Sequence, residues 1–315
     1  MKLTILKDPY DGDPAKGRDA FVGGSDAGAI FGLNPWKSAY TLWCEKTGQI
    51  SGEVPDNDAM KTGRDLENYV AQRFCEETGK RVRKDNYTYS VKEFPFMRGH
   101  IDRRVIGENA ILECKTAGGF QNKAYAAGEF PKHYYVQCLH YMAVTGAKRA
   151  YLAVLCFPHF YMFTFDRDEE EIKALVTKEA EFWDSVEHFV WTENLDGSDS
   201  TTATINEVYA DSEPEEPPIG MPADLQEEAE ELEQITQTIK ELTARKNELE
   251  NHAKAFMENA EEMSCRRWRY TWRTQMKTGI DTKVLKEQRP DIYEHYKKQT
   301  VSRVFRRERI NEEND

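Results

Sequence analysis

The sequence of 315 residues predicts an α/β domain that is followed by a long helix and a small basic α+β tail. Helix-like and strand-like segments alternate over residues 1–195, which indicates a mixed central sheet flanked by helices. Residues 196–222 are acidic and rich in proline, serine and threonine, which is typical of a linker. A heptad-patterned acidic helix follows over residues 223–262, and residues 263–315 form a basic aromatic C-terminal subdomain.

Glycines and capping residues mark the helix boundaries in the first domain. The run GGSDAGAIFG places Ser25 or Asp26 near a helix N-cap and Gly32 near the end of that helix. The expected order is helices at 23–32, 35–48 and 62–79, strands at 82–91, 94–106 and 110–116, a helix at 131–146, strands at 149–157 and 160–167, and a helix at 168–191.

The net charge of −13 conceals an uneven distribution along the chain. Residues 205–262 carry 17 acidic and 4 basic side chains, whereas residues 265–315 carry 14 basic and 8 acidic ones. A basic tail is compatible with a nucleic-acid ligand even when the whole chain is acidic. The six cysteines are scattered without a CxxC or Cys/His cluster, which argues against a structural zinc or iron–sulfur site.

The hydropathy pattern indicates no membrane segment. No run approaches 18 apolar residues, and the first residues, MKLTILKDPYDGD, lack the pattern of a signal peptide. We therefore expect a soluble, intracellular protein that has no contact with a membrane.

The run GHIDRRVIGENAILECKTA places charged residues inside two strand-like segments. Side chains two apart on a strand share a face, so Glu113 and Lys115 project together, and the turn at residues 107–109 can bring Asp102 beside Glu113. Two such carboxylates suit Mg²⁺ or Mn²⁺, and the lysine would then orient or deprotonate a water that attacks phosphorus. The alternative is a cross-strand ion pair on an exposed face.

Two helices carry further polar candidates. Glu67 shares a helical stripe with apolar residues, so its carboxylate either has a partner or metal there or lies at the edge of the stripe. Gln137 and Tyr141 lie one helical turn apart, and the pair either positions a water or phosphate or simply packs. His100, two residues before Asp102, is expected to be a hydrogen-bonded strand histidine rather than a metal ligand.

Five separated blocks together resemble a known family. They are GGSDAGAIFGLNPWKSAYTLWCEKTG, GRDLENYV, GHIDRRV, ILECKT and VQCLHYMAVTG. In this order they resemble the PD-(D/E)xK nucleases of the YqaJ-type viral recombinase family, which includes phage lambda exonuclease. The resemblance covers about residues 18 to 190. It implies a restriction-endonuclease-like core, and so a nuclease domain, for residues 1–195.

The resemblance also implies a role for individual residues. Asp102 and Glu113 would bind two divalent ions, with Glu67 and the backbone carbonyl of Cys114 as further ligands. Lys115 would serve the attacking water, and Gln137 and Tyr141 would lie near the scissile phosphate. Arg18 and Ser25 match the spacing of an arginine and a serine that hold the terminal 5′-phosphate in lambda-type enzymes.

The function implied by the resemblance is a Mg²⁺- or Mn²⁺-dependent 5′–3′ exonuclease acting on double-stranded DNA ends. It would leave 3′ single-stranded tails for a single-strand annealing protein during phage-type recombination. The resemblance further implies a homo-oligomer, with a trimer as one form, in the cytoplasm of a bacterial host that carries the phage or prophage. The alternatives are a structure-specific or single-strand nuclease of the same fold, and a non-catalytic DNA-binding or adaptor protein acting through the coiled helix.

The basic tail lies outside this resemblance. Arginines and aromatic residues alternate in the run RRWRYTWRTQ, which suits stacking on single-stranded nucleic acid and contacts with phosphates. The candidate contacts are Arg267, Trp268, Arg269 and Trp272. The alternative is a small packed subdomain in which the tryptophans form the core.

Overall fold

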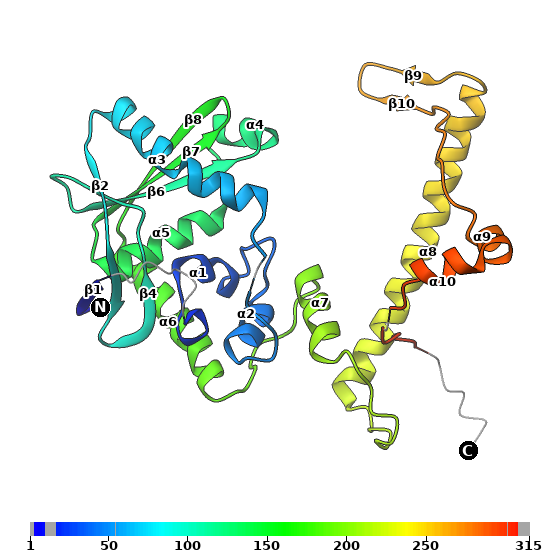
Figure 1. The fold of residues 1–315 in the computed structure, drawn as a ribbon, viewed down its shortest axis with the longest axis horizontal. Coiled ribbons are helices and arrows are strands. Elements are labelled where there is room, and N and C mark those ends of the chain that lie inside the picture. Colours follow the sequence, from blue (N-terminus) through cyan, green and yellow to red (C-terminus); the bar gives the residue numbers. More distant parts are fainter. Residues whose placement is uncertain (1–2, 10–16, 54, 301, 308–315) are drawn as a thin grey trace. The chain divides into compact units, whose positions relative to one another are not determined.

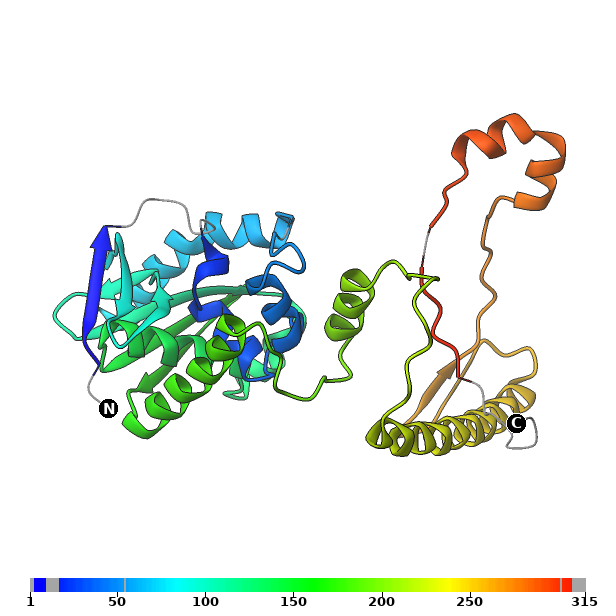
Figure 2. The same ribbon diagram turned by 90° about the horizontal axis from the view of Figure 1, so that it is seen from below.

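The computed structural model describes residues 3–9, 17–53, 55–300 and 302–307. The chain divides into two units, Met1–Ala210 and Asp211–Asp315, each of which is considered by itself (Figures 1 and 2). The last residues of the expected basic subdomain, 308–315, lie outside the described part of the chain. None of the described helices is both long enough and apolar enough to cross a membrane.

A five-stranded mixed sheet forms the centre of the first unit (Figure 1). Its strand order is β2–β5–β6–β7–β8, in which β6 and β7 pair in parallel and the other neighbours pair antiparallel. The five strands are β2 (Val82–Lys84), β5 (Arg103–Val105), β6 (Ala110–Ala117), β7 (Arg149–Cys156) and β8 (His159–Asp166). Strand β6 therefore lies between β5 and β7, and both of its edges are paired.

A second sheet has three strands in the order β1–β3–β4, and its buried residues belong to one core cluster with residues of β6 and β7. Its strands are β1 (Ile5–Pro9), β3 (Tyr87–Val91) and β4 (Phe94–Gly99). The two strands expected at 82–91 and 94–106 are thus each divided between the two sheets. The break after β4 leaves Asp102 in the short connection that leads into β5.

Helices cover both faces of the central sheet, as the predicted fold class requires (Figure 1). Helix α3 (Asp58–Thr78) packs Val70, Ala71 and Phe74 on one face, against residues of β5, β6 and β7. Helices α5 (Lys132–Thr145) and α6 (Glu169–Glu187) belong to the cluster on the other face. The α/β core with a mixed sheet is confirmed, and α5 is the crossover helix that a parallel β6–β7 pair needs.

Shorter helices complete the first unit. They are η1 (Arg18–Ala20), α1 (Gly24–Ile30), α2 (Ala39–Lys46), η2 (Gly119–Gln121) and α4 (Asn122–Ala126). Helix α1 packs mainly against α5, and α2 contacts α1 and η1. The N-terminal part of the domain is therefore placed against the helix that carries Gln137 and Tyr141.

The segment expected to be a linker, residues 196–222, contains a helix, α7 (Asp199–Val208), that belongs to the first unit. The physical reason is a network of hydroxyl groups between α7 and α2. Thr201 Oγ1 donates to Ser38 Oγ at 2.8 Å, and the hydroxyls of Thr41 and Thr204 lie 2.7 Å apart. The serines and threonines of this segment therefore help to form a helix that packs against α2, so the segment is not a linker over its whole length.

The second unit is built on the long helix α8 (Ala223–Met257). The expected heptad helix continued to residue 262, but Glu258 adopts a φ of 50° and ends α8. A short hairpin of β9 (Glu262–Ser264) and β10 (Arg269–Thr271) follows, and then α9 (Thr282–Gln288) and α10 (Pro290–Tyr296).

A buried polar pair joins α5 to α6 in the first unit. His140 and Glu179 are both fully buried. His140 Nε2 donates to the carbonyl oxygen of Arg98 at 2.8 Å, and Nδ1 lies 2.8 Å and 3.0 Å from the two carboxylate oxygens of Glu179. The Glu179 carboxylate and His140 Nδ1 bond each other inside the core, so the loss of either residue leaves a buried polar group of the other without this partner.

We predict that Glu179→Ala lowers the free energy of unfolding by roughly 3–5 kcal/mol, the range found when one partner of a buried pair is removed. Urea unfolding followed by far-UV circular dichroism measures this change. Glu181→Ala, at an exposed position of the same helix, is the matched control and should change the stability by about 0.5 kcal/mol or less. Equal effects of the two substitutions would contradict the structural role of the pair.

Candidate active site

Strand pairing brings the predicted acidic residues together. Asp102 immediately precedes β5, and its Oδ2 accepts a hydrogen bond from the backbone N–H of Cys114 in β6 at 2.8 Å. Alternation along β6 directs Leu112 and Cys114 to the α3 face and Glu113 and Lys115 to the α5 face. The turn between β5 and β6 therefore places Asp102 beside the two charged residues of β6, as the sequence indicated.

The Glu113 carboxylate is the centre of the site. Its Oε1 accepts a hydrogen bond from Gln137 Nε2 at 2.9 Å and forms an ion pair with Lys115 Nζ at 2.8 Å. The residue is 3% exposed, and Oε2 is buried with no hydrogen-bond partner among the residues that the structure describes. A buried carboxylate oxygen without a hydrogen-bond partner favours the binding of a cation or of a hydrogen-bond donor.

The electrostatics of the site show an excess of negative charge. Burial and the neighbouring Glu113 carboxylate raise the pKa of Asp102 well above its ordinary value. Burial on its own disfavours the Lys115 ammonium, but the carboxylates of Glu113 and Asp102 outweigh it and raise the pKa of Lys115. Lys115 is accordingly protonated at neutral pH, and one ammonium group faces two carboxylates.

Helix α5 supplies the polar wall opposite β6. Gln137 Nε2 also donates to the hydroxyl oxygen of Tyr141 at 3.1 Å, so Gln137 links Tyr141 to Glu113. Burial is the main cause that raises the pKa of Tyr141, which keeps its hydroxyl group protonated. A Cβ atom added at Gly24 would lie 2.5 Å from the Tyr141 ring, so α1 approaches Tyr141 closely only because position 24 is glycine.

Glu67 has a partner, one of the alternatives expected for a carboxylate on this stripe, and its role as a metal ligand stays a prediction. Its Oε1 lies 2.5 Å from Nη1 of Arg103, which is buried in β5 and also donates to Asn68 Oδ1 at 2.6 Å. Arg103 Nη1 further donates to the carbonyl oxygen of Asp102 at 2.6 Å. Arg103 was not among the predicted site residues, although an arginine directly after Asp102 in a buried strand is a signal that could have identified it.

The carboxylates of Asp102 and Glu113 suit a hard divalent cation that takes only some of its ligands from the protein. Within the described ranges, no three histidine, cysteine, aspartate or glutamate side chains are arranged to hold a metal ion. Asp102 and Glu113 nevertheless place like charges together, and Glu113 Oε2 lacks a partner. A divalent cation would relieve both conditions, and Mg²⁺ commonly binds through one or two carboxylates together with waters and substrate phosphates. The carbonyl of Cys114 as a ligand stays a prediction.

Arg18 and Ser25 lie together near the start of α1. Arg18 Nη2 donates to Ser25 Oγ at 2.7 Å and lies 3.4 Å from the buried carboxylate of Asp26. Lys46 Nζ forms a second ion pair with Asp26 at 2.9 Å. Burial alone would raise the pKa of Asp26, but the two cations outweigh it and lower that pKa. Asp26 and Lys46 thus hold Arg18 in place, a role that the sequence pattern did not reveal.

Two further sets of predicted residues are His100 in the first unit and four basic or aromatic residues in the second unit. His100 follows the last residue of β4 and so lies just outside the strand in which it was expected, and its Nδ1 lies 3.5 Å from Thr88 Oγ1. In the second unit Trp268 is 69% exposed and Trp272 is 48% exposed, so these tryptophans do not form a packed core. Arg269 in β10 forms an ion pair with Glu262 at 2.6 Å, and Arg267 is exposed. A role of these four residues in binding nucleic acid stays a prediction.

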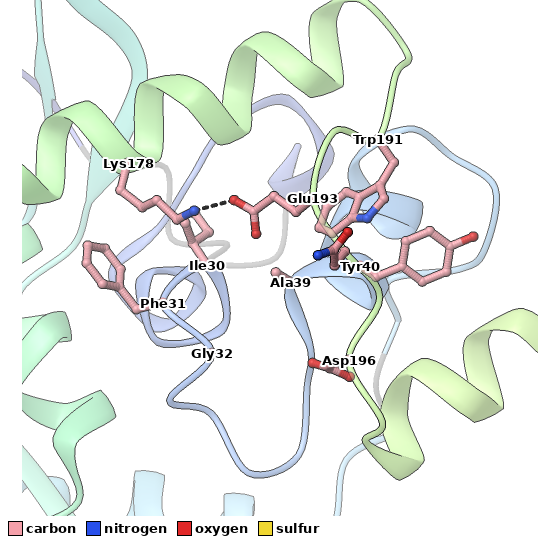
Figure 3. Close-up of a pocket in the computed structure, with 10 residues that line it drawn as sticks. Ile30, Phe31, Gly32, Ala39, Tyr40, Lys178, Trp191, Glu193 and Asp196 are labelled. Atoms are coloured by element: carbon pink, nitrogen blue, oxygen red, sulfur yellow. Dashed lines mark hydrogen bonds and ion pairs between the residues drawn. The ribbon is translucent and has the colours of Figure 1, made fainter. Parts of the chain in front are cut away.

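A cavity of about 300 Å³ lies elsewhere in the first unit, between α1, α2 and the segment after α6 (Figure 3). An ion pair between Lys178 and Glu193 crosses its rim, and the rings of Tyr40 and Trp191 form one wall (Figure 3). None of its lining residues belongs to the carboxylate site, so the cavity contributes nothing to the chemistry described above.

Comparison with known proteins decides the family. Residues 15–148 match the family described as "YqaJ-like viral recombinase domain". The uncharacterized protein YqaJ of Bacillus subtilis (strain 168) is 36% identical over 287 residues, which are 90% of each chain. The chain belongs to the YqaJ-like viral recombinase family. All of the residues from Asp102 to Tyr141 that line the carboxylate site lie within the matched YqaJ-like domain.

Two solved structures resemble this YqaJ-family chain in part. An alkaline exonuclease of Laribacter hongkongensis is 19% identical, with a TM-score of 0.48, over 55% of this chain and 90% of that one. A phage-related exonuclease of Haemophilus somnus 129PT is 16% identical, with a TM-score of 0.43, over 54% of this chain and 96% of that one.

We predict that Asp102→Asn raises the melting temperature of the metal-free YqaJ-family protein at neutral pH. The amide oxygen can still accept the hydrogen bond from Cys114, while the repulsion from Glu113 is removed. A rise of about 2–4 °C corresponds to roughly 1 kcal/mol in a domain of this size. Differential scanning calorimetry with and without Mg²⁺ measures it, and Mg²⁺ should stabilise the wild type more than the variant.

The matched control is Asp65→Asn, at an exposed position of α3, which removes the same charge outside the site. It should leave both the melting temperature and its response to Mg²⁺ close to those of the wild type. A lower melting temperature for Asp102→Asn in the absence of metal would show that the carboxylate pair is not repulsive.

Proposed function

We propose that the protein is a metal-dependent deoxyribonuclease that degrades double-stranded DNA from its ends in the 5′ to 3′ direction. The observation that supports this most strongly is the partly buried cluster of Asp102, Glu113 and Lys115, in which Glu113 Oε2 lacks a partner among the described residues. Membership of the YqaJ-like viral recombinase family is consistent with a nuclease.

The proposed cofactor is Mg²⁺ or Mn²⁺, with two ions per site. Asp102 and Glu113 would hold the ions, with the Cys114 carbonyl and Glu67 as further ligands. Glu67 would then have to exchange its present ion pair with Arg103. Bound divalent ions would supply the positive charge that offsets the negative charge developing on the phosphate and would make water a better nucleophile.

The side chains of the chain itself divide the remaining work. Lys115 is placed to orient the attacking water and to stabilise the reacting phosphate, since its ammonium group already lies 2.8 Å from Glu113. Gln137 and Tyr141 present an amide and a hydroxyl group on the same side of the sheet, where they would position the scissile phosphate. Burial of the cluster strengthens each of these interactions by excluding water.

The direction of digestion is proposed from Arg18 and Ser25. Their guanidinium and hydroxyl groups, 2.7 Å apart, would bind the terminal 5′-phosphate of the DNA. Two features of the fold support this position. Asp26 and Lys46 fix the arginine, and Gly24, adjacent to Ser25, contacts the ring of Tyr141 in the carboxylate site.

The proposed biological setting is recombination by single-strand annealing. Removal of one strand from its 5′ end leaves a 3′ single-stranded tail, which an annealing protein would take up. Further proposals are a homo-oligomer, with a trimer as one form, and a cytoplasmic location in a bacterium that carries the phage or prophage. Arg267, Trp268, Arg269 and Trp272 are proposed as additional contacts to single-stranded DNA, since both tryptophans are exposed.

A structure-specific or single-strand nuclease of the same fold is the second candidate, because the carboxylate cluster would serve either substrate. A non-catalytic DNA-binding or adaptor protein acting through the coiled helix is the third, and the assembled cluster of Asp102, Glu113 and Lys115 disfavours it. The experiments below separate the three.

We predict that Lys115→Ala reduces the Mg²⁺-dependent release of nucleotides from linear duplex DNA at least about 100-fold, as the loss of a donor that stabilises the transition state does. Release of acid-soluble label from duplex DNA measures it, and EDTA should stop the wild type. Lys123→Ala, at an exposed position of α4, is the control and should digest like the wild type. Equal digestion by Lys115→Ala and the wild type would show that the assigned site is wrong.

We predict that Arg18→Ala slows digestion of 5′-phosphorylated duplex ends about tenfold or more, because a hydrogen bond to a charged group contributes about 1.5–3 kcal/mol. Digestion of ends with a 5′-hydroxyl group should be slow for both proteins. Duplexes labelled at either end, with and without 5′-phosphates, measure both effects, and the exposed Arg64→Ala provides the control. Release from 3′ ends would overturn the direction, and full digestion of single strands alone would favour the second candidate.

A further inference from the structure

Helix α8 carries a stripe of apolar side chains, and within the described residues no other segment covers most of their surface. Its six central apolar residues are between 43% and 64% exposed: Leu225, Leu232, Ile235, Ile239, Leu242 and Leu249. They occupy the a and d positions of a heptad repeat along a helix of 35 residues. A helix with such an apolar stripe is normally covered by another element, because the apolar side chains contribute to stability only when they are removed from water.

Two charged residues interrupt the stripe and restrict the choice of partner. Glu228 occupies a d position and Lys246 an a position, and both are exposed. The helix is also polarised, since residues 223–239 carry six acidic side chains and no basic one, whereas residues 240–257 carry three acidic and four basic ones. A partner that covers the stripe must compensate one negative and one positive charge 18 positions apart.

We propose that α8 forms an antiparallel two-stranded coiled coil with α8 of a second copy of this chain. In an antiparallel pair each a residue shares a layer with a d residue of the partner helix. When Glu228 is placed opposite Lys246 of the second copy, the two-fold axis passes close to Gln237. The remaining layers then pair Leu225 with Leu249, Leu232 with Leu242, and Ile235 with Ile239, each layer occurring twice.

The flanking positions agree with the same register. Glu231 and Arg245 both occupy g positions, and this register places each opposite the other in the second copy. Asp224 and His252 are related in the same way at the ends of the contact. The acidic half of each helix therefore faces the half that carries all four basic side chains, which favours pairing and determines its direction.

Other pairings leave charges without compensation. A parallel pair would place Glu228 opposite Glu228 and Lys246 opposite Lys246, which puts like charges in two layers of the interface. An antiparallel pair shifted by one heptad would place Glu228 opposite Ala253 and Lys246 opposite Ile235, so both charges would be buried unpaired. The pattern thus selects one direction and one register.

The chain's own tail touches a flank of α8 rather than the stripe. Arg307 lies 3.4 Å from the carbonyl oxygen of Ala229 and 3.8 Å from the carboxylate of Glu233. Ala229 and Glu233 occupy e and b positions, outside the a and d rows. The described part of the tail therefore leaves the a and d residues open to a second helix.

The test is sedimentation equilibrium of the full chain with charge substitutions in the stripe. We expect the α8 contact to join the 36.5 kDa chains in pairs, in addition to any separate contact that forms a trimer. Glu228→Lys and Lys246→Glu should each weaken the association at least about tenfold, because each places like charges in two layers. The double substitution Glu228→Lys/Lys246→Glu should restore the wild-type dissociation constant to within about threefold, since the opposite charges face each other again.

Two matched substitutions control for a general effect of charge. Glu230→Lys and Lys240→Glu make the same charge changes on α8 at f and b positions, and neither should change the association. The comparison of the single, double and control substitutions tests the α8 contact even if other surfaces of the chain also associate. A monomeric wild type, single substitutions without effect, or a double substitution that does not restore association would each overturn the proposal.

Discussion

The close approach of two carboxylates in a partly buried place is the constraint on which the first unit depends. Asp102 and Glu113 repel each other, and the surrounding fold supplies the groups that make this arrangement tolerable. The backbone N–H of Cys114 bonds one carboxylate, while Lys115 and the amide of Gln137 bond the other. These groups come from β6 and from the crossover helix α5, so the parallel β6–β7 pair and the helix that connects its strands are requirements of the site as well as of the sheet.

The parts of the site that follow from local geometry could be predicted from the sequence. A period of two on a strand directs Glu113 and Lys115 to one face, and a short turn returns the chain past Asp102. The ion pair of Glu67 with Arg103 could not be predicted in this way, because it joins a helix to a strand 36 residues away. Such a pair depends on how α3 is rotated on the sheet, which a single sequence does not determine.

The same distinction separates the predicted from the unpredicted parts of the fold. Helices closed by glycine and strands rich in β-branched and aromatic residues were expected close to where they occur, since caps and periodicity are local signals. Helix α7 was missed because a segment rich in hydroxyl side chains has the composition of a linker. The hydrogen bonds of these side chains to Ser38 and Thr41, which hold the helix in place, depend on the tertiary structure. Likewise the end of α8 at Met257 follows from the backbone conformation of Glu258, which the heptad pattern does not encode.

The position of β6 between two paired strands restricts changes in the length of the chain. An extra residue in the turn at Gly107, where the backbone has a φ of 87°, would lengthen a loop and leave the strand pairing intact. An extra residue between Leu112 and Glu113 would turn every following side chain of β6 to the opposite face. Glu113 and Lys115 would then point toward the apolar residues of α3, and Cys114 toward Gln137. Insertions and deletions among relatives should therefore accumulate in the turn and be absent from the strand.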